Sequence, residues 1–367
     1  MFNDIPLYTY YKNSNKPVNE WDTKMLIIGF GSIGQNVLLQ TLNLGVMHKD
    51  NRVLIDIYDT DIESKMAIFA NHFNFDVFEA DGETMTLKNT VADGTLQIRC
   101  HKLNVRFREF VEEIRQNSRK QPYTYVVAGI DDVSIAVTSA MRLSAVFDEE
   151  GTSDAPIILR MDSDRRLAKY LQNNDRTFSN VRLLDERSEV LTLDLILNQE
   201  INKMAKDFHC FYSTIQVLSK GETSWGVSKD SAETLWNTTP MFKRSSSKAL
   251  AAHDETKQVM MDRLAKELEQ ISADEKIEKL IGTDGSLMKY DGEIWRLKRD
   301  DFAFLNDLME DRFARSIAEM EHRRWCYFMI SEGWRYGTQR NDERKIHTCL
   351  IPFKELLEDK KGRYTIK

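Results

Sequence analysis

The sequence is poor in residues that interrupt regular structure and in residues that cross-link small domains. Its 367 residues include only six prolines and sixteen glycines, about 2% and 4%, where roughly 5% and 7% are usual. This scarcity argues against long disordered linkers and favours long regular elements, with helix predominating. The four cysteines are far apart and form no CxxC pair, so neither a disulfide framework nor a zinc knuckle is expected.

Long apolar runs and an excess of positive charge are also missing. No stretch approaches the roughly 18 apolar residues of a membrane helix, and the first residues lack the basic start and apolar run of a secretory signal. The chain carries 51 basic and 58 acidic residues, a net charge of -7, which argues against general nucleic-acid binding. The sequence therefore predicts a cytoplasmic protein with no membrane span, and its length predicts two domains.

Short apolar runs alternate with helical patterns through the first half. Runs of this kind are typical of strands buried on both faces of a parallel sheet. The alternation predicts an α/β fold with a doubly wound, mostly parallel, Rossmann-like sheet. The expected strands are 24–28, 52–58, 96–100, 123–128, 155–161 and 181–184, and the expected helices include 35–44, 107–118 and 133–147.

A glycine motif lies between the first expected strand and the first expected helix. It reads Gly29, Phe30, Gly31, Ser32, Ile33, Gly34. In a dinucleotide site the first glycine makes the tight turn, the second lets the pyrophosphate approach, and the third lets helix and strand pack closely. The helix N-terminus would supply N–H groups and a positive dipole end to the phosphates. Alternatively, the glycines serve packing alone.

Asp59 follows the second expected strand, 25 positions after Gly34. An acid near this position commonly binds a ribose 2′-hydroxyl and would repel a 2′-phosphate. The expected cofactor is therefore NAD(H) or an adenosine nucleotide rather than NADP(H). Gly129 and Asp131 follow the fourth strand at the same carboxyl edge and are further candidates, although an ordinary polar loop explains them equally well.

This half resembles the nucleotide-binding domains of Trk-type potassium uptake systems over about residues 24–190. The resemblance rests on Gly29, Gly31, Gly34, Asp59 and the segment 126–132. It implies a regulatory module that binds a nucleotide and often pairs as a homodimer. The segment 57–61 is more distantly similar to ThiF-like adenylating enzymes, but no convincing catalytic cysteine or downstream Arg and Lys set accompanies it.

Composition and periodicity divide the chain into four parts. Apolar residues at helical spacing predict a helix over 192–208 that links the sheet to the second half of the chain or contacts a second copy. The polar segment 219–230 has two glycines and no apolar run, so it is the best boundary. The expected parts are an N-terminal extension (1–20), the nucleotide-binding domain (21–210), a linker (211–232) and a second domain (233–367).

Arg244, Ser245 and Ser246 precede an alanine-rich run in the second domain. Serine before such a run is typical of an N-cap, so a helix is expected to open near Ala249 and reach about Ile271. Anions bind well at helix N-termini. The pattern therefore makes these three residues candidates for binding a phosphate or carboxylate, although plain capping explains it too.

Further candidates lie near the C-terminus. His322 and Trp325 are expected on one helix face, where a histidine is more often structural than catalytic. No nucleophile or metal-ligand partner accompanies it, so neither a catalytic site nor a metal site is predicted. Trp334 and Tyr336 could stack on a base, while Arg340 and Lys345 could contact phosphates; His347 completes this set. Alternatively, the aromatic residues form a small core.

The same region resembles the RyR domain, the repeat first seen in ryanodine receptors. The motifs are Glu321-His322-x-x-Trp325, Gly333-Trp334-x-Tyr336-Gly337, Lys345-x-His347 and Pro352-Phe353 with Leu356. The resemblance spans about 233–360, including Trp236 and 244–246. This sequence departs from the family at two positions. Thr348 stands where the family usually has Pro, and Ser247 stands where Asn is frequent. It implies a smaller, mainly α-helical ligand-sensing module of bacterial signalling or phage-defence systems.

Two functions remain open on the sequence alone. The first is a non-enzymatic, nucleotide-sensing regulator that recognises a small-molecule nucleotide and a further ligand or protein partner. The alternative is an NAD-dependent oxidoreductase or a ThiF-like nucleotide-using enzyme. The glycine motif and Asp59 fit both functions, but an enzyme also needs a positioned acid, base or nucleophile.

Overall fold

The computed structural model describes most of the chain as two compact units. The described residues are 1–2, 5–73, 75–80, 84–88, 95–152, 154–160, 179–184, 203–210, 229–281, 288–290, 295–297 and 309–359. The first unit comprises Met1–Thr192 and Met329–Pro352, and the second comprises Leu193–Phe328 and Phe353–Lys367.

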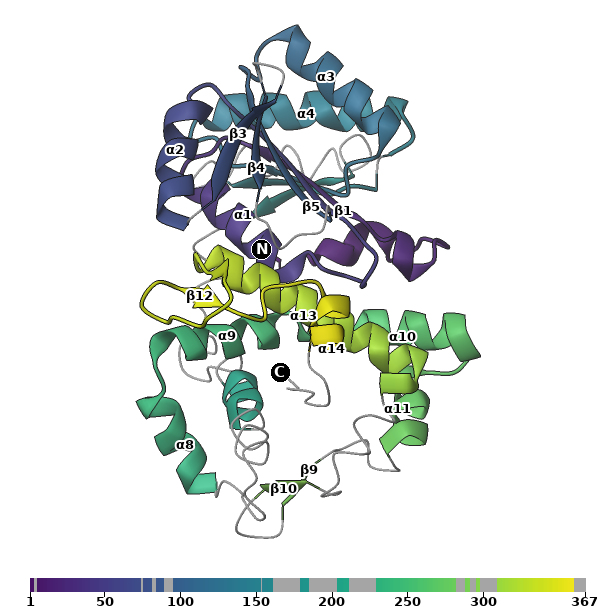
Figure 1. The fold of residues 1–367 in the computed structure, drawn as a ribbon. Helices are drawn as coiled ribbons and strands as arrows, with labels where there is room; N and C mark the ends of the chain where they lie inside the picture. Colours follow the sequence, from purple (N-terminus) through teal and green to yellow (C-terminus); the bar gives the residue numbers. More distant parts are fainter. Residues whose placement is uncertain are drawn as a thin grey trace. The chain divides into compact units, whose positions relative to one another are not determined.

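An eight-stranded sheet forms the centre of the first unit (Figure 1). Six strands run parallel in the order β5-β2-β1-β6-β7-β8. When only these six strands are numbered in chain order, their order in the sheet is 3-2-1-4-5-6. This is the order of a Rossmann-like sheet, and it confirms the predicted fold class. Their bounds are β1 Thr23–Ile28, β2 Val53–Asp59, β5 Leu96–Lys102, β6 Tyr125–Ala128, β7 Ile157–Arg160 and β8 Val181–Leu184.

A hairpin that the sequence analysis did not predict extends the sheet. Its strands, β3 (Asp76–Ala80) and β4 (Thr84–Lys88), pair antiparallel, and β4 pairs antiparallel with β5. The strand order therefore begins β3-β4-β5. An antiparallel edge on an otherwise parallel sheet is common in doubly wound folds.

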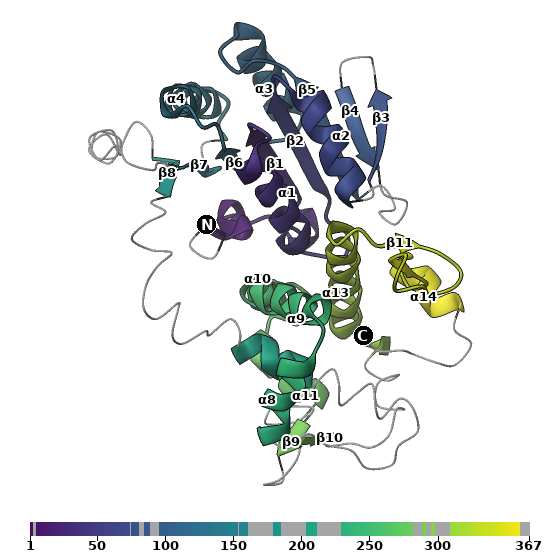
Figure 2. The ribbon, with the colours of Figure 1, turned by 90° about the vertical axis from the view of Figure 1, so that its left-hand side faces the viewer.

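Helices cover both faces of the sheet (Figure 2). One face carries α1 (Ser32–Leu44) and α2 (Ile62–Phe73), and the other carries α3 (Arg108–Lys120) and α4 (Val133–Glu149). The side chains of Leu26, Ile28 and Val126 form a buried core with Phe110 of α3 and other apolar residues of α3 and α4. Period-two burial against both layers explains why these strands are apolar throughout.

The first 22 residues belong to the first unit. Two short 3₁₀ helices, η1 (Leu7–Tyr11) and η2 (Val18–Glu20), bury Leu7 and Val18. Trp21 is fully buried and its ring stacks on Tyr11 at 5.2 Å between centroids. The segment expected as an N-terminal extension therefore contributes to the core of this unit.

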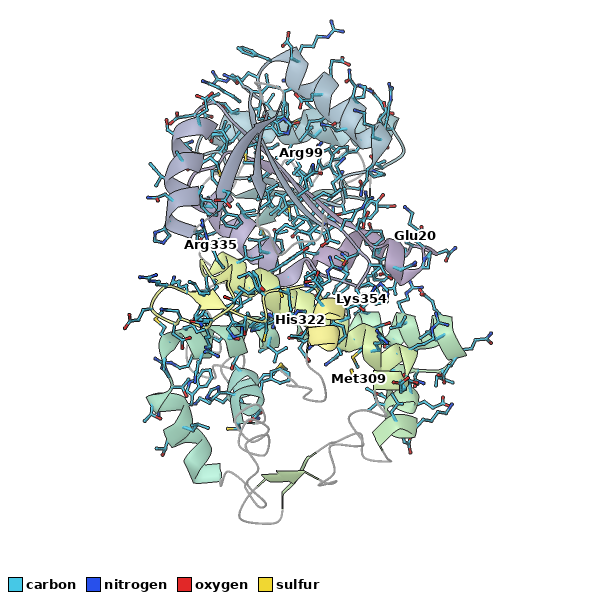
Figure 3. All side chains as sticks on the ribbon, viewed as in Figure 1. Glu20, Arg99, Met309, His322, Arg335 and Lys354 are labelled. Carbon is cyan, nitrogen blue, oxygen red and sulfur yellow. The ribbon has the colours of Figure 1, made fainter. Side chains whose placement is uncertain are left out.

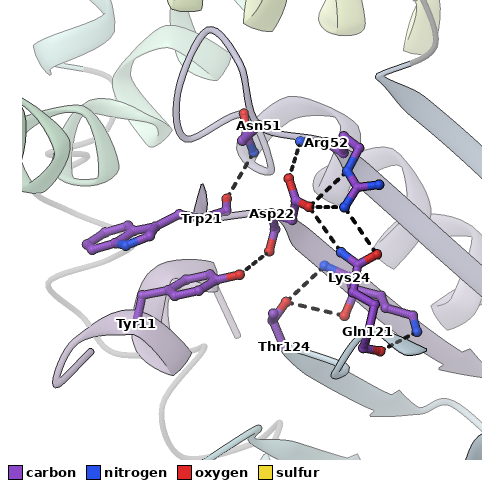
Figure 4. Close-up of polar contacts among 8 residues, drawn as sticks. All are labelled: Tyr11, Trp21, Asp22, Lys24, Asn51, Arg52, Gln121 and Thr124. Atoms are coloured by element: carbon purple, nitrogen blue, oxygen red, sulfur yellow. Dashed lines mark hydrogen bonds and ion pairs between the residues drawn. The ribbon is translucent and has the colours of Figure 1, made fainter. Parts of the chain in front are cut away.

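Polar contacts close the amino edge of the sheet (Figure 4). The Arg52 guanidinium, just before β2, donates to Asp22 Oδ2 at 2.6 and 2.9 Å, and Gln121 Nε2 donates to the same oxygen at 3.0 Å. The Thr124 hydroxyl accepts from the backbone N–H of Lys24 at 3.0 Å. These groups lie at or before the first residues of strands β1, β2 and β6, and their bonds fix the starts of all three.

The second unit is mainly helical. Residues 203–210 are helical, and 203–208 are the described part of the helix expected over 192–208. Of the boundary expected at 219–230, residues 219–228 lie outside the described residues, whereas 229–230 are helical. The remaining elements are α8 Lys229–Thr238, α9 Met241–Ala252, α10 Asp254–Glu269, α11 Ala273–Ile281, the two-stranded β9 Met288–Tyr290 and β10 Trp295–Leu297, and α14 Phe353–Asp359.

Helix α13 (Arg312–Ser331) spans the division between the units. The short parallel strands β11 (Arg335–Tyr336) and β12 (Ile346–His347) follow it in the first unit. There the Ser331 hydroxyl lies 3.4 Å from Asn43 Oδ1, near the end of α1. Among the described residues, no helix is long and apolar enough to cross a membrane.

The helix expected to open near Ala249 is wrong in its bounds. Helix α9 begins at Met241 after Pro240, ends at Ala252, and is separated from α10 by His253. His253 is fully buried and its N–H bonds to the carbonyls of Ala249 and Leu250. Asp254 and Glu255 then begin α10, where acidic side chains favour a helix N-terminus.

Candidate nucleotide site

The glycine loop lies at the carboxyl edge of β1, where the sequence places it. Gly29 has a φ of +89°, in the left-handed region that favours glycine. Its N–H donates to the Tyr58 carbonyl of β2 at 2.8 Å. A Cβ on Gly29 would lie 3.1 Å from the Gly129 carbonyl. Backbone conformation and crowding therefore both require glycine at this turn.

Gly34 and Gly31 differ in what surrounds them. A Cβ on Gly34 would lie 2.1 Å from the Gly29 carbonyl oxygen, so glycine lets α1 pack against the loop. Among the described residues, a Cβ on Gly31 would meet no atom within 4 Å, and the φ of Gly31 is −76°. Neither crowding nor backbone conformation requires glycine at position 31.

The N-terminus of α1 presents backbone donors beside this space. Gly31 is the N-cap and has no side chain that could accept a hydrogen bond. Ser32, Ile33 and Gly34 begin the helix, and the first N–H groups of a helix have no acceptor within it. These donors and the helix dipole favour an anionic group at this position.

Asp59 ends β2 and is anchored to the loop. Its Oδ2 accepts the N–H of Phe30 at 2.7 Å and the ammonium of Lys65 at 2.7 Å, and its Oδ1 accepts the N–H of Asp61 at 2.8 Å. Burial raises the pKa of the carboxyl, but the bonds from Lys65 and the two N–H groups outweigh burial and lower that pKa. Asp59 is therefore an ionised anchor of the glycine loop.

Lys65 is the neighbour that sequence analysis missed. It lies in the first turns of α2, six residues after Asp59, with about a third of its side chain exposed. The Ser64 hydroxyl beside it donates to Asp61 Oδ1 at 2.8 Å. The basic residue near the strand-end acid was visible in the sequence, but only the turn between β2 and α2 brings the two charges together.

Gly129 and Asp131 lie beside the glycine loop and at the start of α4, respectively. The N–H of Gly129 bonds to the Ile28 carbonyl at 2.8 Å, and a Cβ on Gly129 would lie 3.3 Å from the Ile33 side chain. Asp131 is exposed. The next residue, Asp132, is the N-cap of α4 and accepts from the N–H groups of Ser134 and Ile135. Asp132 therefore has a structural role that the sequence analysis did not assign.

A buried charge network stabilises β2 around Asp56, three residues before Asp59 (Arg99, a member of the network, is labelled in Figure 3). Asp56 is fully buried and accepts from Arg99 at 2.7 and 3.0 Å and from the Tyr123 hydroxyl at 2.7 Å. Burial raises the pKa of Asp56, but contacts with His101, Arg99 and Tyr123 outweigh burial and lower that pKa. Removal of one partner would leave a buried charge unpaired, which strongly destabilises a protein. The network therefore holds β2, the strand that ends in Asp59, in its place in the sheet.

His101 extends this network toward α3. Its Nδ1 lies 3.1 Å from Glu113 and its ring stacks on Tyr58 at 4.3 Å between centroids. Burial lowers the pKa of His101, but the nearby carboxylates of Asp56 and Glu113, 3.7 and 3.1 Å from its ring nitrogens, outweigh burial and raise that pKa. The Tyr58 hydroxyl donates to Glu113 at 2.7 Å, so β2, β5 and α3 are joined by polar contacts.

A polar hollow of about 460 Å³ lies at the opposite, amino edge of the sheet. Asp22, Arg52 and Gln121 contribute to its wall, and these three side chains already bond to one another. The parallel-sheet rule places ligands at the carboxyl edge. The glycine loop is therefore the better candidate for a nucleotide site.

Arg244, Ser245 and Ser246 do not lie at a helix N-terminus. They lie within α9, where the Arg244 N–H already bonds to the Pro240 carbonyl at 3.2 Å. The expected N-cap is wrong because the helix begins earlier, after Pro240. These residues therefore do not place an anion at a helix N-terminus, and their role as ligand contacts stays a prediction.

His322 lies on α13 in the second unit (Figure 3) and is buried. Its ring is 5.8 Å from that of Trp325 and 5.7 Å from that of Phe353, and its Nε2 is 3.5 Å from Cys326 Sγ. The expected shared face of His322 and Trp325 is confirmed. These surroundings are those of a packed histidine.

An ion-pair cluster holds the same stretch of α13. Glu321 accepts from Arg324 at 2.7 Å and lies 3.1 Å from the ammonium of Lys257 on α10. Burial raises the pKa of Glu321, but Arg324, Lys257 and His253 outweigh burial and lower it to about 2. The first residue of the Glu-His-x-x-Trp motif therefore joins α13 to α10.

The other five candidates of this region lie in the first unit. Trp334 and His347 are buried, with ring centroids 6.0 Å apart. Tyr336 is about half exposed. The exposed Arg340 pairs with Asp342 at 2.7 Å, and Lys345 donates to the Glu332 carbonyl near the end of α13 at 2.7 Å. Tyr336, Arg340 and Lys345 are therefore the accessible residues of the five.

The described geometry thus divides the nine candidates. Arg244, Ser245, Ser246 and His322 belong to the second unit, and Trp334, Tyr336, Arg340, Lys345 and His347 belong to the first. The Lys345 backbone has a φ of +53°, and its ammonium is used in capping α13. The expectation that it contacts a phosphate stays a prediction.

Comparison with known proteins gives one family match. No solved structure matches the chain, and no Trk-type family model matches the first half. The upstream part of the expected resemblance, 233–304, lies outside the match. Residues 305–367 match the family model of the RyR domain, so the C-terminal part of the chain is similar to that family.

Proposed function

We propose that this chain is a nucleotide-responsive regulatory protein. Its Rossmann-like half binds NAD(H) or another adenosine nucleotide, and the region that includes the RyR match recognises a second ligand or a protein partner. The observation that carries the proposal is the presence of glycine at position 31. Neither packing against the described residues nor φ requires glycine there, but close approach of a pyrophosphate to the backbone would require it.

Two further features support a nucleotide at this loop. The first N–H groups of α1 are donors for phosphate oxygens, and Asp59 fixes the loop through the Phe30 N–H. A donor set held in place before binding loses less freedom when the ligand arrives. The fit therefore rests on residues that β1, β2 and α1 already position.

The C-terminal region offers a second recognition surface. Tyr336 exposes an aromatic ring for stacking, and Arg340 carries an exposed guanidinium that Asp342 orients. Such groups suit a base and a phosphate, or an acidic segment of a protein partner. The contact of Ser331 with Asn43 lies at the opposite end of α1 from the glycine loop, so α1 is a direct physical link between the two regions.

The wider setting of the proposal follows from the sequence. We infer a cytoplasmic protein that pairs as a homodimer and takes part in bacterial signalling or phage defence, as the two family resemblances imply. The regulatory function needs the glycine loop and a responsive C-terminal region. It does not require turnover of the nucleotide.

The test is a binding screen with one matched variant. Thermal unfolding of the full chain is measured with NAD(H), NADP(H), ATP, AMP and cyclic nucleotides, followed by calorimetry on any ligand that stabilises it. Gly31→Ala places a methyl group where the phosphates would approach and should weaken binding at least about tenfold, or 1.4 kcal/mol. Its unfolding temperature without nucleotide should stay close to that of the wild type.

Two results would contradict the proposal. Absence of stabilisation by every nucleotide in the screen would exclude the nucleotide-responsive function. Undiminished affinity in Gly31→Ala would place the bound nucleotide elsewhere. Consumption of NADH at a rate that Gly31→Ala abolishes would instead favour an oxidoreductase.

A further inference from the structure

We propose that Lys65 is a ribose-binding residue, and that Lys65 and Asp59 together recognise the free 2′,3′-diol of the nucleotide. The inference rests on the proposed function and adds the chemical class of the ligand: an adenosine nucleotide with both ribose hydroxyls unmodified. No such role was predicted for Lys65 from the sequence. The turn between β2 and α2 brings Lys65 to the end of β2, where it pairs with Asp59.

The hydrogen-bonding capacity of Asp59 is largely used within the protein. A carboxylate has about four lone-pair sites. Oδ2 accepts from Phe30 and Lys65, and Oδ1 accepts from Asp61. One acceptor site on Oδ1 is left, so Asp59 cannot by itself accept from both hydroxyls of a ribose.

Lys65 supplies the complementary groups. Its ammonium has three N–H donors, and within the described part of the chain its ammonium bonds only to Asp59. About a third of the side chain is exposed. The pair therefore offers one acceptor site on Asp59 Oδ1 and two donors on an ammonium that lies 2.7 Å from Asp59 Oδ2, at the carboxyl edge.

A vicinal diol matches this arrangement. One hydroxyl can donate to Asp59 Oδ1 while the other accepts from Lys65. A 2′-deoxyribose loses one of these bonds and leaves a charged partner unmatched. A 2′-phosphate brings negative charge beside Asp59 and Asp61, while the single positive charge of Lys65 is already paired with Asp59. The pair therefore favours the unmodified ribose over both analogues.

A simpler role for Lys65 is to neutralise the buried Asp59. That role predicts a loss of stability and an equal loss of affinity for every nucleotide when Lys65 is replaced. Ribose recognition instead predicts a change in the ratio of affinities between nucleotides that differ only at the 2′ position. The ratio separates the two roles because a general loosening of the loop cancels in it.

A nearby ion pair provides the matched control. Lys102 ends β5 and lies 2.9 Å from Glu63 of α2, with both side chains more than half exposed. It joins the same helix to the neighbouring strand. Its backbone lies opposite Asp59 in the β2–β5 register, but among the described residues its ammonium pairs with Glu63 and not with the Asp59 carboxylate. Lys102→Met therefore removes the same charge and a similar interaction beside the site.

The experiment measures calorimetric affinities of the full chain for two pairs of nucleotides that differ only at the 2′ position: ADP with 2′-deoxy-ADP, and AMP with adenosine 2′,5′-bisphosphate. The wild type should bind ADP about tenfold more tightly than 2′-deoxy-ADP, as expected for a hydrogen bond to a charged group, and should bind AMP more tightly than adenosine 2′,5′-bisphosphate. Lys65→Met should reduce the first ratio to within about twofold. Lys65→Arg should keep part of it, and Lys102→Met should leave it unchanged.

The outcomes separate this inference from the proposed function. ADP binding with no 2′ discrimination in the wild type, or with an unchanged ratio in Lys65→Met, overturns the inference and leaves the proposed function standing. Absence of ADP binding, together with no response in the nucleotide screen, overturns both. If Lys65→Met does not fold, Lys65→Arg takes its place: a wild-type ratio with weaker binding overall would overturn ribose recognition.

Discussion

The two edges of one parallel sheet are built in opposite ways. At the amino edge, side chains bond to one another: Asp22 holds Arg52 and Gln121, and Thr124 holds the Lys24 backbone. At the carboxyl edge, Gly31 faces open space and α1 begins without a side-chain cap. The same strands therefore end in a closed polar network on one side and in backbone donors on the other.

Within the length of β1 and β2, residues that stabilise the fold lie at the amino edge, and residues that could bind a ligand lie at the carboxyl edge. Lys24 lies at the amino end of β1, where its ammonium donates to the carbonyls of Asn117 and Gln121 at the end of α3. Gly29 follows the carboxyl end of the same strand. Polar groups that satisfy one another stabilise the fold, whereas donors without a protein acceptor can bind a ligand. Changes at the two edges should therefore have separable effects.

The largest effect is expected where the carboxyl edge is itself tightly packed. Gly34→Ala would place a methyl group 2.1 Å from the Gly29 carbonyl oxygen, so α1 must move away from the loop. Overpacking of this kind costs about 1–3 kcal/mol, and we expect the upper end because the obstacle is backbone. Urea unfolding measures the loss.

The control for Gly34→Ala is the same change three residues earlier. The methyl group of Gly31→Ala has no atom of the described residues within 4 Å. The substitution should therefore alter the free energy of unfolding by less than about 1 kcal/mol, the usual scale of a change at an N-cap. Equal destabilisation by the two variants would show that the open space at Gly31 is not a property of the folded loop.

A smaller effect is expected from acid at the Asp59 anchor. The pKa of Asp59 in the fold lies below its ordinary value of 3.8, so the ionised carboxylate favours folding. This contribution is fully present above pH 3.8 and is lost as the pH falls through the lower folded value. The stability of Asp59→Asn should therefore approach that of the wild type at low pH, in urea unfolding measured as a function of pH. Parallel curves would show that the Asp59 charge does not hold the loop.

The parallel sheet and the glycine loop could be predicted because their signals are local. Each buried strand is one apolar run, and the loop follows β1 directly, so spacing alone placed Gly29 and Gly34. The β3–β4 hairpin was not predicted because neither strand is a continuous apolar run like those of the parallel strands. Alternation of polar with apolar residues over Thr84–Lys88 and the preceding Asp81-Gly82 pair are nevertheless common signals of a hairpin.

Lys65 and Arg244 show where local signals are insufficient. Lys65 meets Asp59 only because the chain turns between β2 and α2, and a charged residue on a helix is usually a solvated one. Arg244 was assigned to a helix N-terminus from the serines beside it, whereas Pro240 allows the helix to begin earlier. In both cases, the position of a neighbouring element decides the role of the side chain.

The smallest effect is expected at the amino edge. Arg52→Ala removes the guanidinium from Asp22, but about half of the Arg52 side chain is exposed, and exposed ion pairs contribute about 0.2–1 kcal/mol. Asp22 keeps the backbone N–H of residue 52 at 2.6 Å and Gln121 Nε2 at 3.0 Å, so its carboxylate stays bonded. Urea unfolding should show a loss within that range, and calorimetry should show unchanged nucleotide affinity because the substitution lies at the opposite end of β2 from Asp59. A loss of nucleotide affinity in Arg52→Ala would mean that the amino-edge network positions the glycine loop through the strands, and the separation of the two edges would then be wrong.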